Sequence, residues 1–267
     1  MVLHHPGAGA APASSVGDDD FHWDDAAEAE LQAIEAAYAS AKRRRLPDWT
    51  SPTSSEVEKA AMDILGKIES IKTPGPVSLG FDLEWRPFAG RGEPPCKVAV
   101  MQLCMEKTLC YVLHIAHSGV PPKLKSLLED NSSIKVGICI DNDARKMLND
   151  YDICVQPLMD LSILANAKLA GPPKRWSLAS LTEMITCKEL PKPSNIRMGN
   201  WEADVLTKKQ LQYAATDAYI SWYLYEALQS LPDCNAEAEI KSVKVSTIDF
   251  PVFTLVTTDF IFISTIG

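Results

Sequence analysis

Three apolar runs follow one another closely in this chain, at 77–84, 97–105 and 108–114. The turns between them are short, so the runs predict strands that pair antiparallel. A fourth apolar run at 134–140 follows a predicted helix near 122–129, and helical patterns dominate afterwards. Hairpin-like strands that pass into alternating strands and helices predict an α/β fold, in which a mixed β-sheet is flanked by α-helices.

The later helices are predicted from their periodicity and from their start signals. The longest, near 207–230, opens with TKKQ, which has the form of a capping box with Thr207 as N-cap and Gln210 as the third helical residue. The other helices are expected at 56–71, from about Asp143, at 160–170 and at 177–186.

The two ends of the chain differ in composition from its middle. Residues 1–55 are rich in Gly, Ala and Pro and then acidic, which predicts a disordered extension, except for a helix over 26–45 that ends in a basic cluster. Residues 56–235 are expected to form the folded domain. Residues 236–267 are β-branched and aromatic, and they are interpreted as a C-terminal tail to which the sequence assigns no role.

The first apolar run ends in two acids, Asp82 and Glu84, within LGFDLEW. Residues two apart on a strand project from the same face, so both carboxylates point to one side of the sheet. Burying two ionised carboxylates together is costly unless a cation neutralises them. Either the end of this run is exposed to solvent, or the pair binds metal.

Asp217 and Tyr213 lie one helical turn apart within YAATDAY, so they share a helix face. Small neighbours, Ala214 and Ala218, would let this helix approach a sheet closely. Another acid, Asp143, follows the fourth apolar run at the start of a helix. Taken singly, these residues have ordinary structural explanations: a core tyrosine beside an exposed aspartate, and a helix N-cap.

Together, the stretches FDLEW, VGICIDNDARKML and YAATDAY resemble the three exonuclease motifs of the DEDD superfamily, in its tyrosine-bearing (DEDDy) branch. The resemblance extends over roughly 76–232, and it also covers WSLASLTEMI (176–185) and IRMGNW (196–201) between the second and third motifs. Within that branch, the chain looks most like the Werner syndrome protein-like exonucleases, including their free-standing plant members.

This resemblance implies a ribonuclease H-like fold and a 3′→5′ exonuclease that hydrolyses DNA from its 3′ end, releases nucleoside 5′-monophosphates and serves DNA repair, replication or recombination. The residues that match the family's catalytic set are the metal-binding carboxylates Asp82, Glu84, Asp143 and Asp217, and the catalytic tyrosine Tyr213. Oxygen ligands favour Mg²⁺ or Mn²⁺. Two such ions clamp the attacking and leaving oxygens of a phosphoryl displacement, and Tyr213 would orient the attacking water.

Basic residues near aromatic ones are candidates for nucleic-acid contact, because a phosphate can pair with the cation while a base stacks on the ring. These candidates are Arg145, Lys146, Arg175, Trp176, Arg197 and Trp201. The formal net charge of −9 argues against such a partner, but residues 56–232 hold 21 acids against 20 bases. The predicted partner is therefore a nucleic acid, DNA by resemblance, with a free or recessed 3′ end.

Seven cysteines without a C-x-x-C pair indicate buried free thiols in a reducing compartment. A secretory segment and an 18-residue apolar run are both missing, which predicts a soluble intracellular protein. The stretch AKRRRLP (41–47) is typical of a nuclear import signal, and equally of a basic helix end. Because the expected substrate is DNA, the predicted location is the nucleus, with the cytoplasm as a second location.

Two other functions stay open. One is a ribonuclease D-like 3′→5′ exoribonuclease, because discrimination of the 2′-hydroxyl depends on pocket shape, which the sequence does not reveal. The other is a non-catalytic nucleic-acid-binding module on the same fold. The complete set of acids argues against the binding module, since a binder gains nothing from mutually repelling carboxylates.

Overall fold

The computed structural model describes residues 53–72, 75–86, 96–232 and 262–263 of the chain. The predicted disorder of the first 55 residues, the helix at 26–45 and the basic stretch at 41–47 therefore lie outside the described residues. Among the helices that are described, none combines the length and the apolar character needed to cross a membrane.

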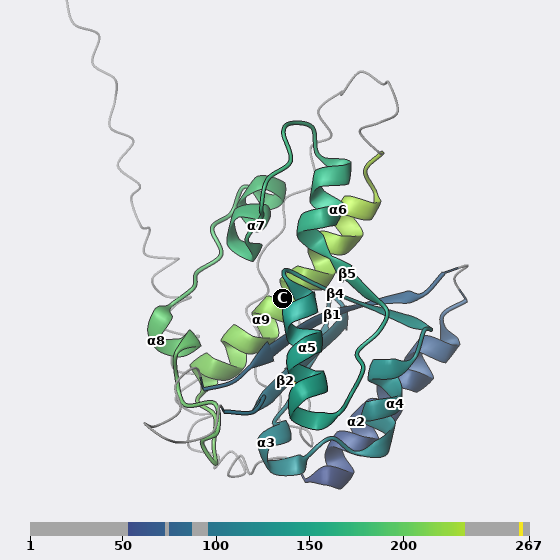
Figure 1. Cartoon of the computed structure of the whole chain (residues 1–267), viewed down its shortest axis with the longest axis vertical. Helices are drawn as coiled ribbons and strands as arrows, with labels where there is room; N and C mark the ends of the chain where they lie inside the picture. Colours follow the sequence, from purple (N-terminus) through teal and green to yellow (C-terminus); the bar gives the residue numbers. More distant parts are fainter. Residues whose placement is uncertain (1–52, 73–74, 87–95, 233–261, 264–267) are drawn as a thin grey trace, which may run out of the picture. The chain divides into compact units, whose positions relative to one another are not determined.

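A mixed sheet forms the centre of the described domain (Figure 1). Its strand order is β5-β4-β1-β2-β3-β6. Its strands are β1 (Val77–Glu84), β2 (Val100–Glu106), β3 (Leu109–Leu113), β4 (Ser133–Gly137), β5 (Leu158–Asp160) and β6 (Phe262–Ile263). The strands β1, β2 and β3 pair antiparallel, as the three apolar runs predict. Strand β4 joins β1 in parallel and β5 joins β4 in parallel, while β6 pairs antiparallel with β3.

Helices cover both faces of this sheet, which confirms the predicted fold class (Figure 1). They are α2 (Ser54–Ser70), α3 (Ile115–Ser118), α4 (Pro122–Glu129), α5 (Ile140–Tyr151), α6 (Leu161–Lys168), α7 (Leu178–Thr186), α8 (Ser194–Arg197) and α9 (Lys208–Gln229). One apolar core lies between the sheet and α6, α7 and α9. A second core contains the apolar faces of α2, α4 and α5.

The best-predicted elements are those with strong local signals. Strand β1 has the predicted bounds, and α9 begins with the predicted capping box, in which the Gln210 backbone N–H donates to Thr207 Oγ1 over 3.2 Å. Helix α5 begins at Ile140, three residues before the predicted start. The reason is Cys139, whose left-handed backbone (φ 57°) turns the chain out of β4 and into the helix. The short elements α3, α8, β5 and β6 were not predicted.

Gly80 allows α9 to pack directly on β1. A Cβ atom at this position would lie 2.0 Å from the carbonyl oxygen of Ala218 and 2.8 Å from Cβ of Trp222. Only glycine fits such a contact without moving one of the two backbones. The sequence predicted the close approach from the small residues of the helix, but the residue that admits it lies on the strand.

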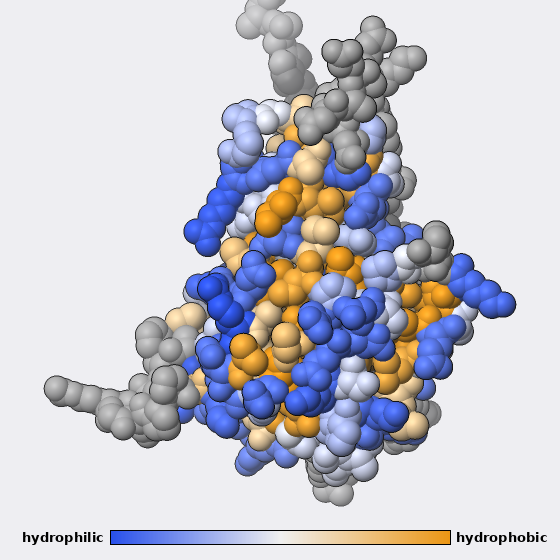
Figure 2. Space-filling model, turned by 45° about the vertical axis from the view of Figure 1, so that its right-hand side comes forward, coloured by the Kyte–Doolittle hydropathy of each residue, from blue (hydrophilic) through white to orange (hydrophobic). Residues whose placement is uncertain are grey.

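Large apolar side chains also remain on the surface. They are Met62, Ile71, Leu148, Ile163, Met184, Met198 and Val205. They come from different elements, and Figure 2 shows hydrophobic and hydrophilic residues side by side over the face in view. Scattered apolar residues are normal on a protein surface, so this pattern does not mark a single docking patch.

The described cysteines all carry free thiols, as predicted. Cys104 and Cys110 are buried in the sheet, whereas Cys154 and Cys187 are exposed. The prediction that the thiols are buried is therefore wrong for these last two, because their positions lie outside the apolar strands.

Candidate active site

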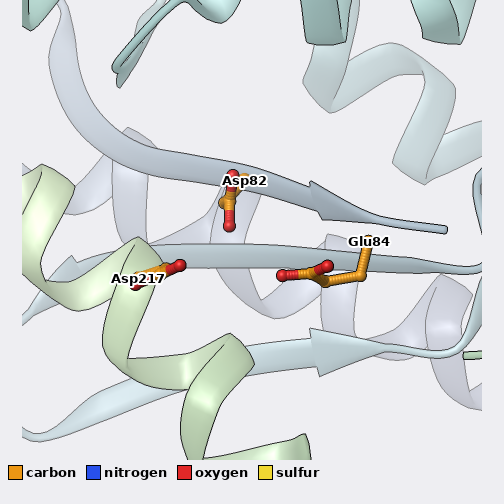
Figure 3. A group of neighbouring side chains, drawn as sticks. All are labelled: Asp82, Glu84 and Asp217. Carbon is orange, nitrogen blue, oxygen red and sulfur yellow. The ribbon is translucent and has the colours of Figure 1, made fainter. Parts of the chain in front are cut away.

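Three carboxylates meet at the contact between β1 and α9. Asp82 and Glu84 project from the end of β1 and Asp217 from α9, and each offers an oxygen atom within 4.8 Å of the others. Figure 3 shows the three side chains converging on one space. The strand period places the first two on one face, and the contact at Gly80 brings the third beside them.

This cluster of Asp82, Glu84 and Asp217, the carboxylate cluster, is poorly hydrated. Glu84 is 7% exposed and Asp217 is 5% exposed. Burial first, and then the charge of Asp217, raises the pKa of Glu84 to about 9. Burial followed by the charges of Asp217 and Glu84 raises the pKa of Asp82 well above its usual range. Such acids hold protons at neutral pH unless a cation compensates them.

The donor chemistry of the carboxylate cluster fits a hard divalent cation. All its donors are carboxylate oxygens, which Mg²⁺ and Mn²⁺ prefer and which Zn²⁺ or copper sites rarely use alone. The close spacing of the oxygens gives a cation two or more ligands at once. The residues present therefore fit the metal that the sequence predicts.

Asp143 lines the same cleft as the carboxylate cluster but stands outside the group of three. It lies in the first turn of α5, where burial raises its pKa to about 7, and its charge contributes to the raised pKa values of Asp82 and Glu84. The ordinary explanation of Asp143 as a helix N-cap is wrong, because Cys139 occupies the cap position. The side chain of Asp143 lines the cleft instead of capping the helix.

Tyr213 lies one turn before Asp217 on α9 and is 8% exposed. Burial raises the pKa of Asp217, while the charge of Lys192 and a hydrogen bond from the Tyr213 hydroxyl lower it. Burial and then the charges of Asp217 and Glu84 raise the pKa of Tyr213 far above its usual value. The phenol therefore stays protonated and acts as a hydrogen-bond donor, not as a base.

All five residues of the predicted catalytic set line one cleft of about 440 Å³. The cleft also contains residues that the sequence did not single out, among them Trp85, Asn142 and Lys192. Lys192 Nζ lies 3.4 Å from Oδ2 of Asp217. The only available signal for Lys192 was its place between two prolines, which does not identify a partner 25 residues away.

The predicted nucleic-acid contacts are distributed unevenly around the cleft. Arg197 lines it, at the end of α8. Arg175 is exposed and approaches the cleft-lining Cys139, its Nη2 lying 3.7 Å from Sγ. Arg145 is exposed on α5, but it borders a separate hollow and donates to Asn142. For these arginines, phosphate contact stays a prediction.

Lys146 has structural partners already. Its Nζ lies 2.7 Å from Oδ2 of Asp150 and donates to the carbonyl oxygen of Cys96 over 2.8 Å. The same ammonium lies 5.2 Å from the ring centroid of Trp85. Lys146 therefore already contacts Asp150, Cys96 and Trp85, and a phosphate would have to compete with these three partners.

Two predicted stacking residues are core residues, which corrects the sequence analysis. Trp201 is 0% exposed and its Nε1 donates to the carbonyl oxygen of Arg197 over 3.1 Å. Trp176 is 6% exposed and its Nε1 donates to Asn166 Oδ1 over 3.0 Å. A buried indole offers no face to a nucleobase, and a basic neighbour in the sequence does not reveal that burial.

Comparison with known proteins gives a consistent result. A family model described as 3′-5′ exonuclease matches residues 52–232. A 3′-5′ exonuclease of Arabidopsis thaliana is 49% identical over 184 residues, which cover 68% of this chain and 64% of that protein. The bifunctional 3′-5′ exonuclease/ATP-dependent helicase WRN of Mus musculus is 40% identical over 156 residues, which cover 58% of this chain and 11% of that protein. The chain thus spans less than two thirds of the length of either relative.

Solved structures share the fold at lower identity. Escherichia coli RNase D superposes with a TM-score of 0.55 at 22% identity, covering 68% of this chain and 44% of that one. Trypanosoma brucei RNase D gives a TM-score of 0.54 at 17% identity, covering 66% of this chain and 64% of that one. These likenesses confirm the predicted ribonuclease H-like fold.

Proposed function

Because this chain belongs to the 3′-5′ exonuclease family, we propose that it hydrolyses DNA from the 3′ end with two metal ions and releases nucleoside 5′-monophosphates. The observation that carries the proposal is the carboxylate cluster, which opens into a cleft with Tyr213 at its side. A binding module would have no use for such a cluster, because the mutual repulsion of its acids lowers the stability of the domain.

The roles of the individual residues follow from their chemistry. Asp82, Glu84, Asp143 and Asp217 would hold the metal ions, and bound Mg²⁺ or Mn²⁺ would supply the charge that activates water and stabilises the leaving oxygen. The protonated Tyr213 hydroxyl donates a hydrogen bond at the cluster and can orient the attacking water. Arg197 supplies positive charge at the cleft for the phosphate of the substrate.

DNA is the proposed substrate because the sequence motifs resemble those of the Werner syndrome protein-like exonucleases. The alternative, RNA, is the substrate class of the structurally similar E. coli protein, which is an exoribonuclease. That likeness is one of fold, so it carries less weight than the similarity of the motifs.

The test compares matched 5′-labelled DNA and RNA duplexes with recessed 3′ ends, in Mg²⁺, in Mn²⁺ and in excess chelator. We expect a ladder of shortened DNA products only when metal is present. Shortening of RNA alone would replace the proposal with the exoribonuclease. Binding of both nucleic acids without any cleavage would leave the non-catalytic module.

The proposed setting is DNA repair, replication or recombination in the nucleus. The support is the basic stretch at 41–47 together with the proposed substrate. Replacing Lys42, Arg43, Arg44 and Arg45 by Ala should abolish nuclear accumulation of the full chain, and undiminished accumulation would reject this stretch as the signal.

A further inference from the structure

A lysine from the segment between α7 and α8 reaches the carboxylate cluster. Lys192 Nζ lies 3.4 Å from Oδ2 of the buried Asp217, while the side chain of Lys192 is 34% exposed. Among the ion pairs of the described residues, no other one involves the cluster. Within the described part of the chain, Lys192 is therefore the one cationic side chain that pairs directly with the cluster.

The charge of Lys192 acts on the whole cluster and not only on its nearest partner. It lowers the pKa of Asp82, Glu84 and Asp217, in each case against the effect of burial. The charge of Arg197 also lowers the pKa of Glu84. Lys192 thus neutralises part of the negative charge of the carboxylate cluster, and a divalent cation would neutralise more of it.

The backbone around Lys192 keeps it directed into the cleft. Pro191 and Pro193 line a second hollow of about 450 Å³, whereas Lys192 lines the catalytic cleft. This alternation is that of an extended segment, and Pro193 has extended dihedral angles (φ −65°, ψ 115°). Because proline fixes φ, the two prolines restrict the directions available to the lysine between them. The stretch Pro191–Pro193 forms a wall between the two hollows and presents the charge of Lys192 to the carboxylates.

We propose that Lys192 is the resident cation of the metal-free site and changes partner during the reaction, pairing with Asp217 until metal binds and then with a phosphate oxygen of the substrate. The inference rests on the proposed function, because it needs a site that takes both metal and phosphate. A metal ion bound at Oδ2 of Asp217 would lie close to Nζ of Lys192, and the repulsion between the two cations favours displacement of the ammonium. The long flexible stem and partial exposure let Nζ move without a change in the backbone.

The first part of the proposal, the displacement of Lys192 from Asp217 by metal, is tested without nucleic acid. Mn²⁺ affinity is measured by calorimetry on the full chain for the wild type, K192M, K192R and K209M. Lys209 is the matched control, because it is an exposed lysine on α9 that lines the second hollow and has no ion pair with the cluster. We expect K192M to bind Mn²⁺ about fivefold more tightly, as a partly exposed ion pair no longer competes. K192R and K209M should bind like the wild type.

Thermal unfolding in excess chelator at pH 8 is a second test of the displacement of Lys192 by metal. K192M should unfold at a lower temperature than K209M, because it lacks the cation that offsets repulsion in the empty cluster. The difference should disappear in saturating Mn²⁺. Equal Mn²⁺ affinity in wild type and K192M would overturn the exchange of partners.

The second part of the proposal, the contact between Lys192 and a phosphate oxygen, is tested by kinetics. The substrate is whichever of DNA or RNA the wild type cleaves. K192M should raise KM about tenfold and reduce the salt dependence of log KM by about one unit of slope, as loss of one phosphate contact predicts. K192R should restore most of the affinity. An unchanged KM, or a wild type that cleaves neither substrate, would overturn the phosphate contact. A wild type that binds no Mn²⁺ would overturn both this inference and the proposed function.

Discussion

The carboxylates of Asp82, Glu84 and Asp217 lie so close together that the stability of the metal-free protein depends on their protonation. For Glu84, the pKa rises from the ordinary 4.5 to about 9 on folding. Between these values the folded protein binds more protons than the unfolded chain. The free energy of unfolding must therefore fall as the pH rises through that window, and it recovers below it.

Glu84→Gln should remove part of this pH dependence. In chelator at pH 8, the variant should unfold about 3 to 6 °C above the wild type, since each kcal/mol shifts a domain of this size by about 2–4 °C. Mg²⁺ should stabilise the wild type more than the variant, and exonuclease activity should fall at least about 100-fold. Thermal unfolding from pH 5 to pH 9 checks the prediction. A wild-type melting temperature that does not change with pH in chelator would contradict it.

Tyr213→Phe removes the hydroxyl that bonds Asp217 and leaves the ring, whose centroid lies 6.3 Å from that of Trp201. The fold should persist, while the single-turnover rate should fall about 10- to 100-fold, because the water loses an orienting group. An unchanged single-turnover rate would remove Tyr213 from the mechanism.

At the scale of elements, the site depends on how closely α9 packs on β1. The two acids of β1 have a fixed spacing along the strand, but Asp217 reaches them only because the Ala218 carbonyl lies against Gly80. The carboxylate cluster and the helix–strand contact are thus one structural feature. A change in that contact must alter the distances within the carboxylate cluster.

Gly80→Ala should therefore impair activity through packing. The added methyl group would stand 2.0 Å from the Ala218 carbonyl oxygen, so the backbones must separate, at a cost of about 3 kcal/mol. Activity should fall more than about tenfold even where the variant is folded. Denaturant unfolding and exonuclease rates measure both effects.

Gly66→Ala is the matched control, because nothing lies within 4 Å of the new Cβ in α2. It should stabilise the protein by up to about 1 kcal/mol and leave activity unchanged. If Gly80→Ala behaved in the same way, the close contact would not position the site.

At the scale of the whole molecule, the described residues of the C-terminal tail (236–267) pair with the sheet at the edge away from the cleft. Two residues, Phe262 and Ile263, pair with Cys110 and Leu109 of β3, and β2 lies between β3 and the strand that carries Asp82 and Glu84. The described contact is thus an edge strand of two residues, and the candidate catalytic residues all precede the tail.

Removing residues 236–267 should leave the exonuclease rate within about twofold, because two backbone pairings at a sheet edge stabilise a domain little. The shortened protein should also be more soluble, since FTLVTTDFIFIST is an apolar, weakly charged stretch typical of aggregation-prone segments. Melting temperature, exonuclease rate and sedimentation of both proteins test this. A marked loss of both stability and rate would make the tail part of the catalytic domain.

Features that depend on neighbours in the sequence were predictable without the structure. The strand period placed Asp82 and Glu84 on one face, the helical turn joined Tyr213 to Asp217, and the capping box marked the start of α9. These signals are local, because dihedral preferences, side-chain periodicity and capping act over a few residues. The resemblance of the motifs then identified the family.

Only the tertiary structure decided what depends on contacts between distant segments. The burial of Trp176 and Trp201, the pairing of Lys192 with Asp217 and the position of Asp143 outside the carboxylate cluster have no local signature. Whether a tryptophan or a lysine meets solvent depends on which segment packs over it, and that is settled when the whole core closes. The sequence alone therefore singled out the acids that line the cleft, and packing decided how close they lie and which cation pairs with them.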